Sequence, residues 1–263
     1  MDKSFDFSNK YTLITGATGK IGQSIIHRLT STQTKFILLD KDIETMGNKF
    51  DKTKINMSHV HLINYDATNE NSCKDAIQDI KNITTRIDYV INSIGMVGTD
   101  DDPGWSVPFE DQSKDSWNKC LEINLTSIFF LIQKLLPLLR ESNECSIVNI
   151  SSIYGVIGPD FDLYEGTDMN NPAAYGVSKA GLIQLTKWLA AALSPSIRVN
   201  SVSPGGIYRN QPDIFTNKYR SKTLLGRMAT EDEISETVLF LLSKMSSYIT
   251  GQNVIVDGGL TIK

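Results

Sequence analysis

Tyr175 and Lys179 are the residue pair in this sequence best suited to moving a proton. They stand four residues apart at the start of a predicted helix, so their side chains share one face, one turn apart. A free phenol has a pKa of about 10, too high for a base at neutral pH, but a nearby ammonium favours the phenolate. We therefore predict that Tyr175 exchanges a proton with a substrate hydroxyl, although such a pair alone is common on helices.

Three further polar residues follow or interrupt apolar segments, where a polar side chain needs a hydrogen-bond partner or a functional role. Ser152 follows the apolar run SIVNI, which puts a hydroxyl at the carboxyl end of a predicted strand, where it can polarise a substrate oxygen or simply cap a turn. Asn124 interrupts the apolar stretch SWNKCLEINLTSIFFLIQKLL and needs partners if it is buried. Asn92 follows another predicted strand, where it can stabilise the sheet or contact a cofactor.

A glycine-rich turn near the N-terminus has the form of a phosphate-binding loop. The run YTLIT continues into Gly16-Ala-Thr-Gly19-Lys-Ile-Gly22 and then into a helical stretch, so a helix N-terminus faces any bound anion. Asp40 lies 18 residues after Gly22, close to the offset of a carboxylate that holds ribose hydroxyls and repels a 2′-phosphate. This pattern predicts NAD, while Lys41 leaves NADP open, and an ordinary strand-to-helix turn is the alternative.

Short β-branched runs alternate with amphipathic stretches, which is typical of a parallel sheet covered by helices on both faces. The predicted strands are Tyr11–Thr15, Lys35–Leu39, Val60–Asn64, Tyr89–Ile91, Ser146–Ile150, Ile197–Val202 and Asn253–Val256. The predicted helices include Ile21–Thr30, Asn71–Asn82, Ser113–Leu139, Ala174–Leu193 and Glu231–Leu242. We expect one α/β domain over residues 1–263, a doubly wound Rossmann fold with a seven-stranded, mostly parallel sheet. Two polar segments, 156–172 and 207–223, are predicted to be substrate loops, and Tyr208–Thr223 within the second is predicted to be a lid.

Composition excludes several classes of function. The net charge is −4 and no dense Lys/Arg block occurs, which argues against nucleic acid as a partner. Cys73, Cys120 and Cys145 are far apart and lack CxxC spacing, so we predict buried thiols rather than disulfides or a metal site. The N-terminus does not resemble a signal peptide, and no run approaches the roughly 18 apolar residues of a membrane span. We expect a cytoplasmic protein without membrane contact.

Taken together, these motifs resemble those of the classical short-chain dehydrogenase/reductase family, along nearly the whole chain. The resemblance is carried by TGATGKIG (Thr15–Gly22), Asp40, Asp66-Ala67-Thr68, NSIG (Asn92–Gly95), Asn124, ISS (Ile150–Ser152), YGVSK (Tyr175–Lys179), VNSVSPGGI (Val199–Ile207) and the closing SSYITGQNVIVDGG. It implies an oxidoreductase that interconverts an alcohol and a ketone with NAD, or less readily NADP. It also implies a small-molecule substrate and a homodimer or homotetramer.

The resemblance assigns roles to particular residues. Ser152, Tyr175 and Lys179 form the catalytic triad, and Asn124 extends it through an ordered water. In the cofactor site, Asp66 contacts the adenine, Asn92 and Ile94 the adenosine side, Lys179 the nicotinamide ribose and Ile207 the nicotinamide amide. The full set of implied cofactor-binding residues is Gly16, Thr18, Gly19, Lys20, Ile21, Gly22, Asp40, Asp66, Ala67, Asn92, Ser93, Ile94, Tyr175, Lys179, Pro204, Gly205 and Ile207.

Two departures from the family pattern bear on the substrate. Lys20 stands where the usual TGxxxGxG turn has its second glycine, which adds a charge near the pyrophosphate. The connection between Ser152 and Tyr175 contains 22 residues, more than the family usually has. It resembles members from bacterial surface-glycan and flagellin-modification pathways and implies a sugar or nucleotide-sugar substrate. Its polar residues suit a hydroxyl-rich ligand or, alternatively, a solvated loop, and they are Asp160, Asp162, Tyr164, Glu165, Asp168 and Asn170.

Two other functions are weighed against this one. The GxxGxxG spacing of the turn favours a sugar-nucleotide epimerase or dehydratase, whereas the PGGI and VDGG segments favour the dehydrogenase branch. A non-catalytic NAD-binding regulator would have no need of Ser152, Asn124, Tyr175 and Lys179 together, and all four are present.

Overall fold

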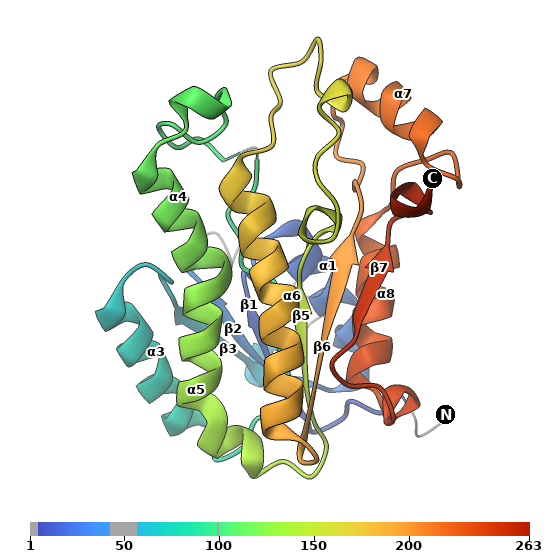
Figure 1. Cartoon of the computed structure of the whole chain (residues 1–263). Coiled ribbons are helices and arrows are strands. Elements are labelled where there is room, and N and C mark those ends of the chain that lie inside the picture. Colours follow the sequence, from blue (N-terminus) through green and yellow to red (C-terminus); the bar gives the residue numbers. More distant parts are fainter. Residues whose placement is uncertain (1–4, 43–56, 99) are drawn as a thin grey trace.

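A seven-stranded sheet with helices on both faces forms the body of the molecule (Figure 1). The computed structural model describes residues 5–42, 57–98 and 100–263. Its strands are β1 (Tyr11–Thr15), β2 (Lys35–Asp40), β3 (Val60–Asn64), β4 (Tyr89–Asn92), β5 (Cys145–Ile150), β6 (Ile197–Pro204) and β7 (Asn253–Val256). Its helices are α1 (Lys20–Leu29), α3 (Glu70–Ile83), α4 (Lys114–Leu121), α5 (Ser127–Arg140), α6 (Ala173–Leu193), α7 (Asp213–Lys222) and α8 (Glu231–Leu242). The predicted fold class is confirmed.

The core lies on both faces of the sheet because the central strands alternate their apolar side chains between the two. On β1, Leu13 packs into the cluster beneath α3, α5 and α6, while Ile14 packs into the cluster beneath α1 and α8. Ile147 and Val148 divide in the same way on β5. All four side chains are fully buried. This two-sided burial explains why the strands appear in the sequence as nearly continuous apolar runs.

The strand order fixes where a ligand can bind. Neighbouring strands within the described part of the chain all pair in parallel, in the order β3-β2-β1-β4-β5-β6-β7. The chain runs outward from β1 through β2 to β3 and then returns to place β4 on the other side of β1. At such a switch point the two strands send their following loops in opposite directions, which opens a crevice at their carboxyl ends. The glycine-rich turn after β1 lies at this crevice.

The long apolar helix predicted over Ser113–Leu139 is divided in the structure. A π-helical turn, Glu122–Thr126, separates α4 from α5. The continuous helix Lys114–Arg140 is long enough to cross a membrane and contains an 18-residue stretch that is apolar enough, with a mean hydropathy of 1.4. Its apolar residues have another explanation, since α5 supplies Ile128, Leu131 and Leu135 to the core under the sheet.

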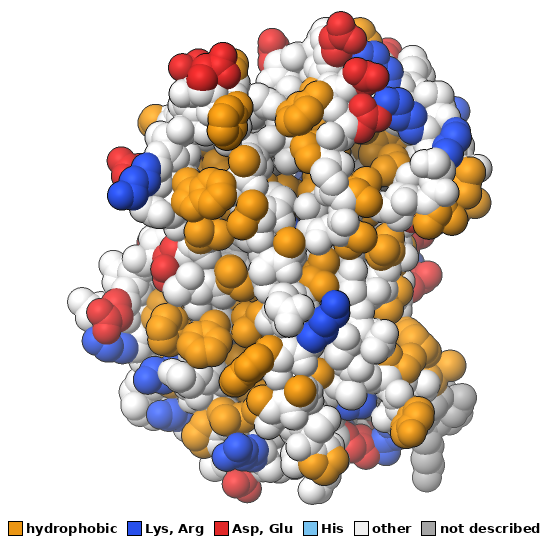
Figure 2. Space-filling model, viewed as in Figure 1, with side chains coloured by type: hydrophobic (Ala, Val, Ile, Leu, Met, Phe, Trp, Pro, Cys, Tyr) orange, Lys and Arg blue, Asp and Glu red, His pale blue; other side chains and the backbone are white. Residues whose placement is uncertain are grey.

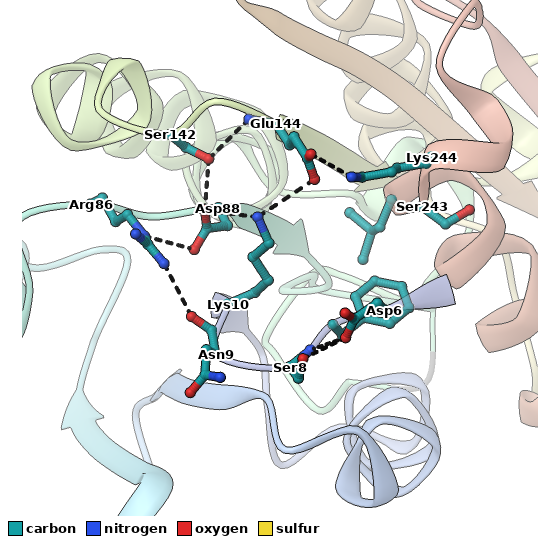
Figure 3. A network of polar contacts seen from close by, with 12 residues as sticks. Asp6, Ser8, Asn9, Lys10, Arg86, Asp88, Ser142, Glu144, Ser243 and Lys244 are labelled. Carbon is teal, nitrogen blue, oxygen red and sulfur yellow. Dashed lines mark hydrogen bonds and ion pairs between the residues drawn. The ribbon is translucent and has the colours of Figure 1, made fainter. Parts of the chain in front are cut away.

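A buried carboxylate, that of Asp88, joins several elements at the end of the sheet opposite the crevice (Figure 3). Asp88, just before β4, is 1% exposed. Its side chain accepts hydrogen bonds from the Tyr11 amide at 2.9 Å, the Ser142 hydroxyl at 2.7 Å and Nε of Arg86 at 3.3 Å. Lys10 lies 3.8 Å away and also pairs with Glu144. One carboxylate therefore joins the start of β1, the start of β4 and the loop before β5.

Replacing this carboxylate is expected to destabilise the fold without altering the groups that line the cleft. Asp88→Ala leaves the Tyr11 amide, the buried Ser142 hydroxyl and the half-exposed Arg86 guanidinium without their acceptor, which should lower the free energy of unfolding by about 3 kcal/mol. Urea unfolding monitored by circular dichroism measures this loss. The exposed Asp79→Ala on α3 serves as the control and should change the free energy by no more than about 0.5 kcal/mol. A comparable loss in both variants would contradict the role given to Asp88.

Candidate active site

Two adjoining cavities form one continuous cleft along the carboxyl ends of the strands. The first, of about 670 Å³, lies over β1, β2 and β3, and the second, of about 580 Å³, lies over β5 and β6. They share the walls formed by Gly19, Ser93 and Gly95. Each has the size of an ordinary small-molecule site, and together they have room for an extended two-part ligand.

The glycine-rich turn brings its backbone close to the following helix and to the loop after β4. Gly16 has φ +66°, a left-handed conformation that favours glycine, and a Cβ there would lie 2.8 Å from the Ile94 backbone. A Cβ at Gly22 would lie 2.6 Å from the Gly16 carbonyl, so Gly22 serves helix packing and does not line the cleft. Asp40 fixes the turn by accepting from the Thr18 amide at 2.9 Å and the Thr18 hydroxyl at 2.8 Å.

The first cavity collects most of the residues predicted for the adenosine half of a dinucleotide. The predicted residues that line it are Gly16, Thr18, Gly19, Asp40, Asp66, Ala67, Ser93 and Ile94. Asp66 accepts from the Thr68 amide and hydroxyl, and these hydrogen bonds hold the pKa of its carboxyl below the ordinary value. Asp100, Asp101 and Asp102 also line this cavity, which makes it predominantly acidic.

Ser152, Tyr175 and Lys179 line the second cavity together, although they come from different elements. Ser152 is the second residue after β5, and Tyr175 and Lys179 lie in the first turns of α6. The Lys179 ammonium is buried, donates to the Ile150 carbonyl at 2.9 Å and lies 5.9 Å from the centre of the Tyr175 ring. The predicted cofactor residues Lys20, Ile21, Pro204, Gly205 and Ile207 line the same cavity.

Burial shifts the pKa values of Tyr175 and Lys179. It raises the pKa of Tyr175, while a hydrogen bond with Ser152 and the charge of Arg209 act in the opposite direction. Burial lowers the pKa of Lys179 to about 8. The prediction that Lys179 lowers the pKa of Tyr175 is therefore not met in this structure, because its ammonium is directed to the Ile150 carbonyl. Tyr175 is a phenol that retains its proton at neutral pH.

Besides Gly22, two other predicted site residues lie outside the cleft. Asn124, in the π-helical turn, is fully buried; its Oδ1 accepts from the Met96 amide at 2.7 Å, and its Nδ2 donates to the Ser178 hydroxyl at 3.0 Å. Asn124 thus joins the turn between α4 and α5 to the loop after β4 and to α6, where Ser178 directly precedes Lys179. Asn92 is also fully buried and donates to Asn149 on β5 at 2.8 Å. The structure therefore gives Asn92 a role inside the sheet and no contact with either cavity.

Three of the four acidic residues of the long connection pair with helix α7 and do not line the cleft. Asp160 and Asp162 pair with Lys222, and Glu165 pairs with Lys218. Figure 2 shows acidic and basic side chains gathered together at the top of the molecule, where Figure 1 places the connection beside α7. Of the six polar residues predicted to suit a hydroxyl-rich ligand, only Tyr164 and Asn170 line the second cavity. The connection is thus held to α7 by its charges and presents its neutral polar groups to the cleft.

Several cavity residues were not singled out from the sequence. Tyr154 lies two residues after Ser152, and its hydroxyl is 2.6 Å from that of Tyr164. Asn171 donates to the same Tyr164 hydroxyl at 3.2 Å. The segment before and within α7 adds Arg209, Gln211, Phe215 and Tyr219. The polar character of residues 207–223 was the one sequence signal for this second group, since their positions depend on how the loop folds back.

Comparison with known proteins agrees with this geometry. Residues 16–261 match the family model described as Enoyl-(Acyl carrier protein) reductase. The chain is 32% identical over 256 residues to the post-translational flagellin modification protein A of Campylobacter coli, covering 95% of this chain and 98% of that protein. It is also 32% identical to the 7alpha-hydroxysteroid dehydrogenase of Bacteroides fragilis, over 262 residues, covering 97% of this chain and 96% of that one.

A solved structure extends the similarity to three dimensions. The short-chain dehydrogenase of Leptospira borgpetersenii, determined with bound NAD⁺, superposes with a TM-score of 0.85 at 35% identity. The alignment covers 100% of this chain and 96% of that one. Members of this family bind NAD(H) or NADP(H). The chain therefore belongs to the classical short-chain dehydrogenase/reductase family and is an oxidoreductase acting on CH–OH groups.

Proposed function

We propose that this enzyme interconverts a secondary alcohol and a ketone on a hydroxyl-rich substrate, with NAD as the cofactor. The observation that carries the reaction is the meeting of Ser152, Tyr175 and Lys179 on one wall of the second cavity. The first cavity, with its glycine turn and Asp40, adjoins that wall. When it is bound, the nicotinamide ring supplies the acceptor or donor of the hydride.

The residues of the second cavity handle the proton that accompanies the hydride. In reduction, the Ser152 and Tyr175 hydroxyls hydrogen-bond the substrate oxygen, and Tyr175 donates its proton as negative charge develops there. The raised pKa of Tyr175 keeps that proton in place at neutral pH. In oxidation, Tyr175 accepts the proton of the substrate hydroxyl, so this direction needs the phenolate. Lys179 supplies a positive charge beside the ring, and Asn124 positions the loop and the helix around it.

NAD is favoured over NADP by the charges around the ribose position. Asp40 ends β2 at the wall of the first cavity, and four further aspartates line the same cavity, against two lysines, Lys41 and Lys119. A 2′-phosphate would bring two negative charges into this acidic region, whereas ribose hydroxyls can donate to Asp40. The amides at the start of α1, from Gly19 to Ile21, would hold the pyrophosphate, and Lys20 adds a positive charge beside them.

The substrate is proposed to be a sugar or nucleotide sugar. The segments 156–172 and 207–223 act as the substrate loops and line the cavity with Tyr164, Asn170, Asn171 and Gln211. Hydroxyl and amide groups of this kind suit a ligand that carries several hydroxyls. The similarity to a flagellin modification protein supports the same substrate class.

The assembly and location are also proposed. Phe130 on α5 is 51% exposed, and Val177 and Trp188 on α6 are 50% and 58% exposed. Figure 2 shows apolar side chains spread over the face that these helices form. An exposed apolar face of this kind supports a homodimer or homotetramer in which α5 and α6 pack against a second copy. The proposed location is the cytoplasm.

A substrate panel tests this function directly. Absorbance of the reduced cofactor is to be followed with sugar phosphates, nucleotide sugars and free polyols, with NAD and NADP compared. A 7α-hydroxysteroid and cyclopentanol serve as apolar controls. We expect kcat/KM to be at least about tenfold higher for a hydroxyl-rich substrate than for either control, since an apolar ligand would take water from the polar groups of the cavity without hydrogen-bonding them. Higher kcat/KM with the steroid would overturn the substrate class while leaving the reaction intact.

A further inference from the structure

The charged residues of the second cavity are all cationic. Lys20, Lys179 and Arg209 line it, and no carboxylate does so among the residues that the structure describes. Lys20 lies at the start of α1, where the pyrophosphate is proposed to bind, and Lys179 belongs to the catalytic trio. The proposed reaction leaves Arg209 without a function. An arginine in a cavity without acidic neighbours on its walls makes that cavity attractive to an anion.

Arg209 is held in place from its backbone and from Nε. Its amide donates to Gln211 at 2.7 Å, and Gln211 in turn donates to the Ile207 carbonyl at 2.8 Å. Its Nε donates to Glu231 at 2.9 Å, and Glu231, at the start of α8, does not line the cavity. Within the described ranges, no hydrogen bond of the protein uses the two Nη groups. The hydrogen bond from Nε to Glu231 therefore orients the guanidinium, and its Nη groups can donate to a ligand.

The guanidinium lies close enough to the reacting groups to affect them. Its charge acts on the Tyr175 hydroxyl and lowers the pKa of that group, against the larger effect of burial. The side chain keeps 40% of its area exposed, so a ligand in the cleft can reach it. A guanidinium offers paired N–H donors that match the two oxygens of a carboxylate or a phosphate.

We propose that Arg209 is a specificity-determining residue that binds a carboxylate or phosphate group of the substrate. The substrate is then an anionic hydroxyl-rich molecule whose charged group lies near the carbon that reacts. This inference rests on the proposed function, which supplies the position of the reacting carbon beside Tyr175. Lysine would supply the charge at this position but not the paired donors, so Arg209→Lys should restore only part of the preference.

The test is a binding measurement on the enzyme saturated with NADH. Isothermal titration calorimetry compares three six-carbon polyols: sorbitol, which carries no charge, gluconate, which carries a carboxylate, and sorbitol 6-phosphate, which carries a phosphate. At low ionic strength, we expect at least one anion to bind about tenfold tighter than sorbitol, and Arg209→Gln to remove that difference. The two anions show whether the site takes a carboxylate, a phosphate or both. The affinities for sorbitol and for NADH should stay within about threefold.

Two controls separate ligand binding from a structural effect. Arg227 forms a similar pair with Glu233 at the start of α8 but does not line the cavity, so Arg227→Gln should leave the anion preference unchanged. Glu231→Gln removes the structural partner of Arg209 and should retain or raise the anion affinity. A loss in Glu231→Gln equal to that in Arg209→Gln would overturn the proposal, because it would assign Arg209 a structural role.

Three other outcomes also overturn it. They are no anion preference in the natural protein, including no measurable anion binding; a preference that survives Arg209→Gln; and weaker NADH binding as the main effect of that change. Because calorimetry needs no turnover, the proposal and the proposed reaction can fail separately. Hydride transfer with no anion preference counts against Arg209 alone, and a preference without hydride transfer for any alcohol or ketone counts against the reaction alone.

Discussion

Tyr175→Phe should lower kcat roughly a thousandfold, because it removes the group that we propose donates and accepts the proton of the reaction. The phenyl ring keeps the packing of the residue beside Met96 and Cys120, so the fold and the second cavity should be preserved. Cofactor affinity should remain within about threefold of the natural value, since the substitution does not alter the glycine turn that is proposed to hold the cofactor. Steady-state kinetics and fluorescence titration with NADH measure these two quantities. Near-normal kcat would refute the assignment of Tyr175.

The pH dependence of alcohol oxidation provides a second test of Tyr175. Oxidation of the alcohol needs the Tyr175 phenolate, and the raised pKa of Tyr175 makes that form scarce at neutral pH. Each unit of pH below the pKa changes the phenolate fraction about tenfold, so the oxidation rate should rise between pH 7 and about pH 9. Tyr175→Phe should show no such rise. Tyr154→Phe, which alters a different hydroxyl in the same cavity, should raise KM and retain the pH dependence.

Asp40→Asn should lower the preference for NAD over NADP by at least about tenfold. The substitution keeps the size of the side chain, and its amide oxygen can still accept from the Thr18 amide and hydroxyl, so the glycine turn should hold its shape. What it removes is the negative charge that opposes a 2′-phosphate, and a charge-assisted hydrogen bond to the ribose. The ratio of kcat/KM for the two cofactors is the measurement.

A second aspartate in the same cavity provides the control. Asp66 lines the first cavity and bonds Thr68 on its own loop, and the family resemblance puts it against the adenine, away from the ribose phosphate position. Asp66→Asn should weaken NAD and NADP alike and leave their ratio unchanged. If both variants shift the ratio equally, overall cavity charge rather than Asp40 sets the specificity. An unchanged ratio in Asp40→Asn would refute the role of Asp40 in cofactor choice.

The sequence predicted the sheet well because its signals are local. β1, β3 and β7 have the predicted bounds, and the other strands differ only at their ends; β6, for example, extends two residues further, to Pro204. Runs of β-branched residues buried on both faces leave a strong pattern in the chain. Helix α7 was not predicted, because it is a mostly polar helix that buries only Phe215 and Tyr219. A short polar helix gives little periodic signal.

Site residues were predictable where a motif fixes both residue type and position. The glycine turn, Asp40, Ser152, Tyr175 and Lys179 meet this condition. The partners of the acidic residues in the long connection did not follow from the sequence, because Lys218 lies 56 residues after Asp162, whose carbonyl accepts a hydrogen bond from it. The same applies to Arg209, which lies in the loop before α7 and whose partner Glu231 begins α8. Such contacts depend on where loops return in space, and no local pattern records that.

The attachment of the long connection to α7 has a consequence for how this enzyme diversifies. The reacting groups are carried by β5 and α6, whereas the connection and α7 are joined to each other by ion pairs at the surface. Mutations that remodel the substrate pocket can therefore accumulate without displacing the atoms that transfer the proton. A change in one segment leaves unpaired charges on the other, so the two should be inherited as a matched set. Among descendants of this protein, substrate choice should change by replacement of both segments together.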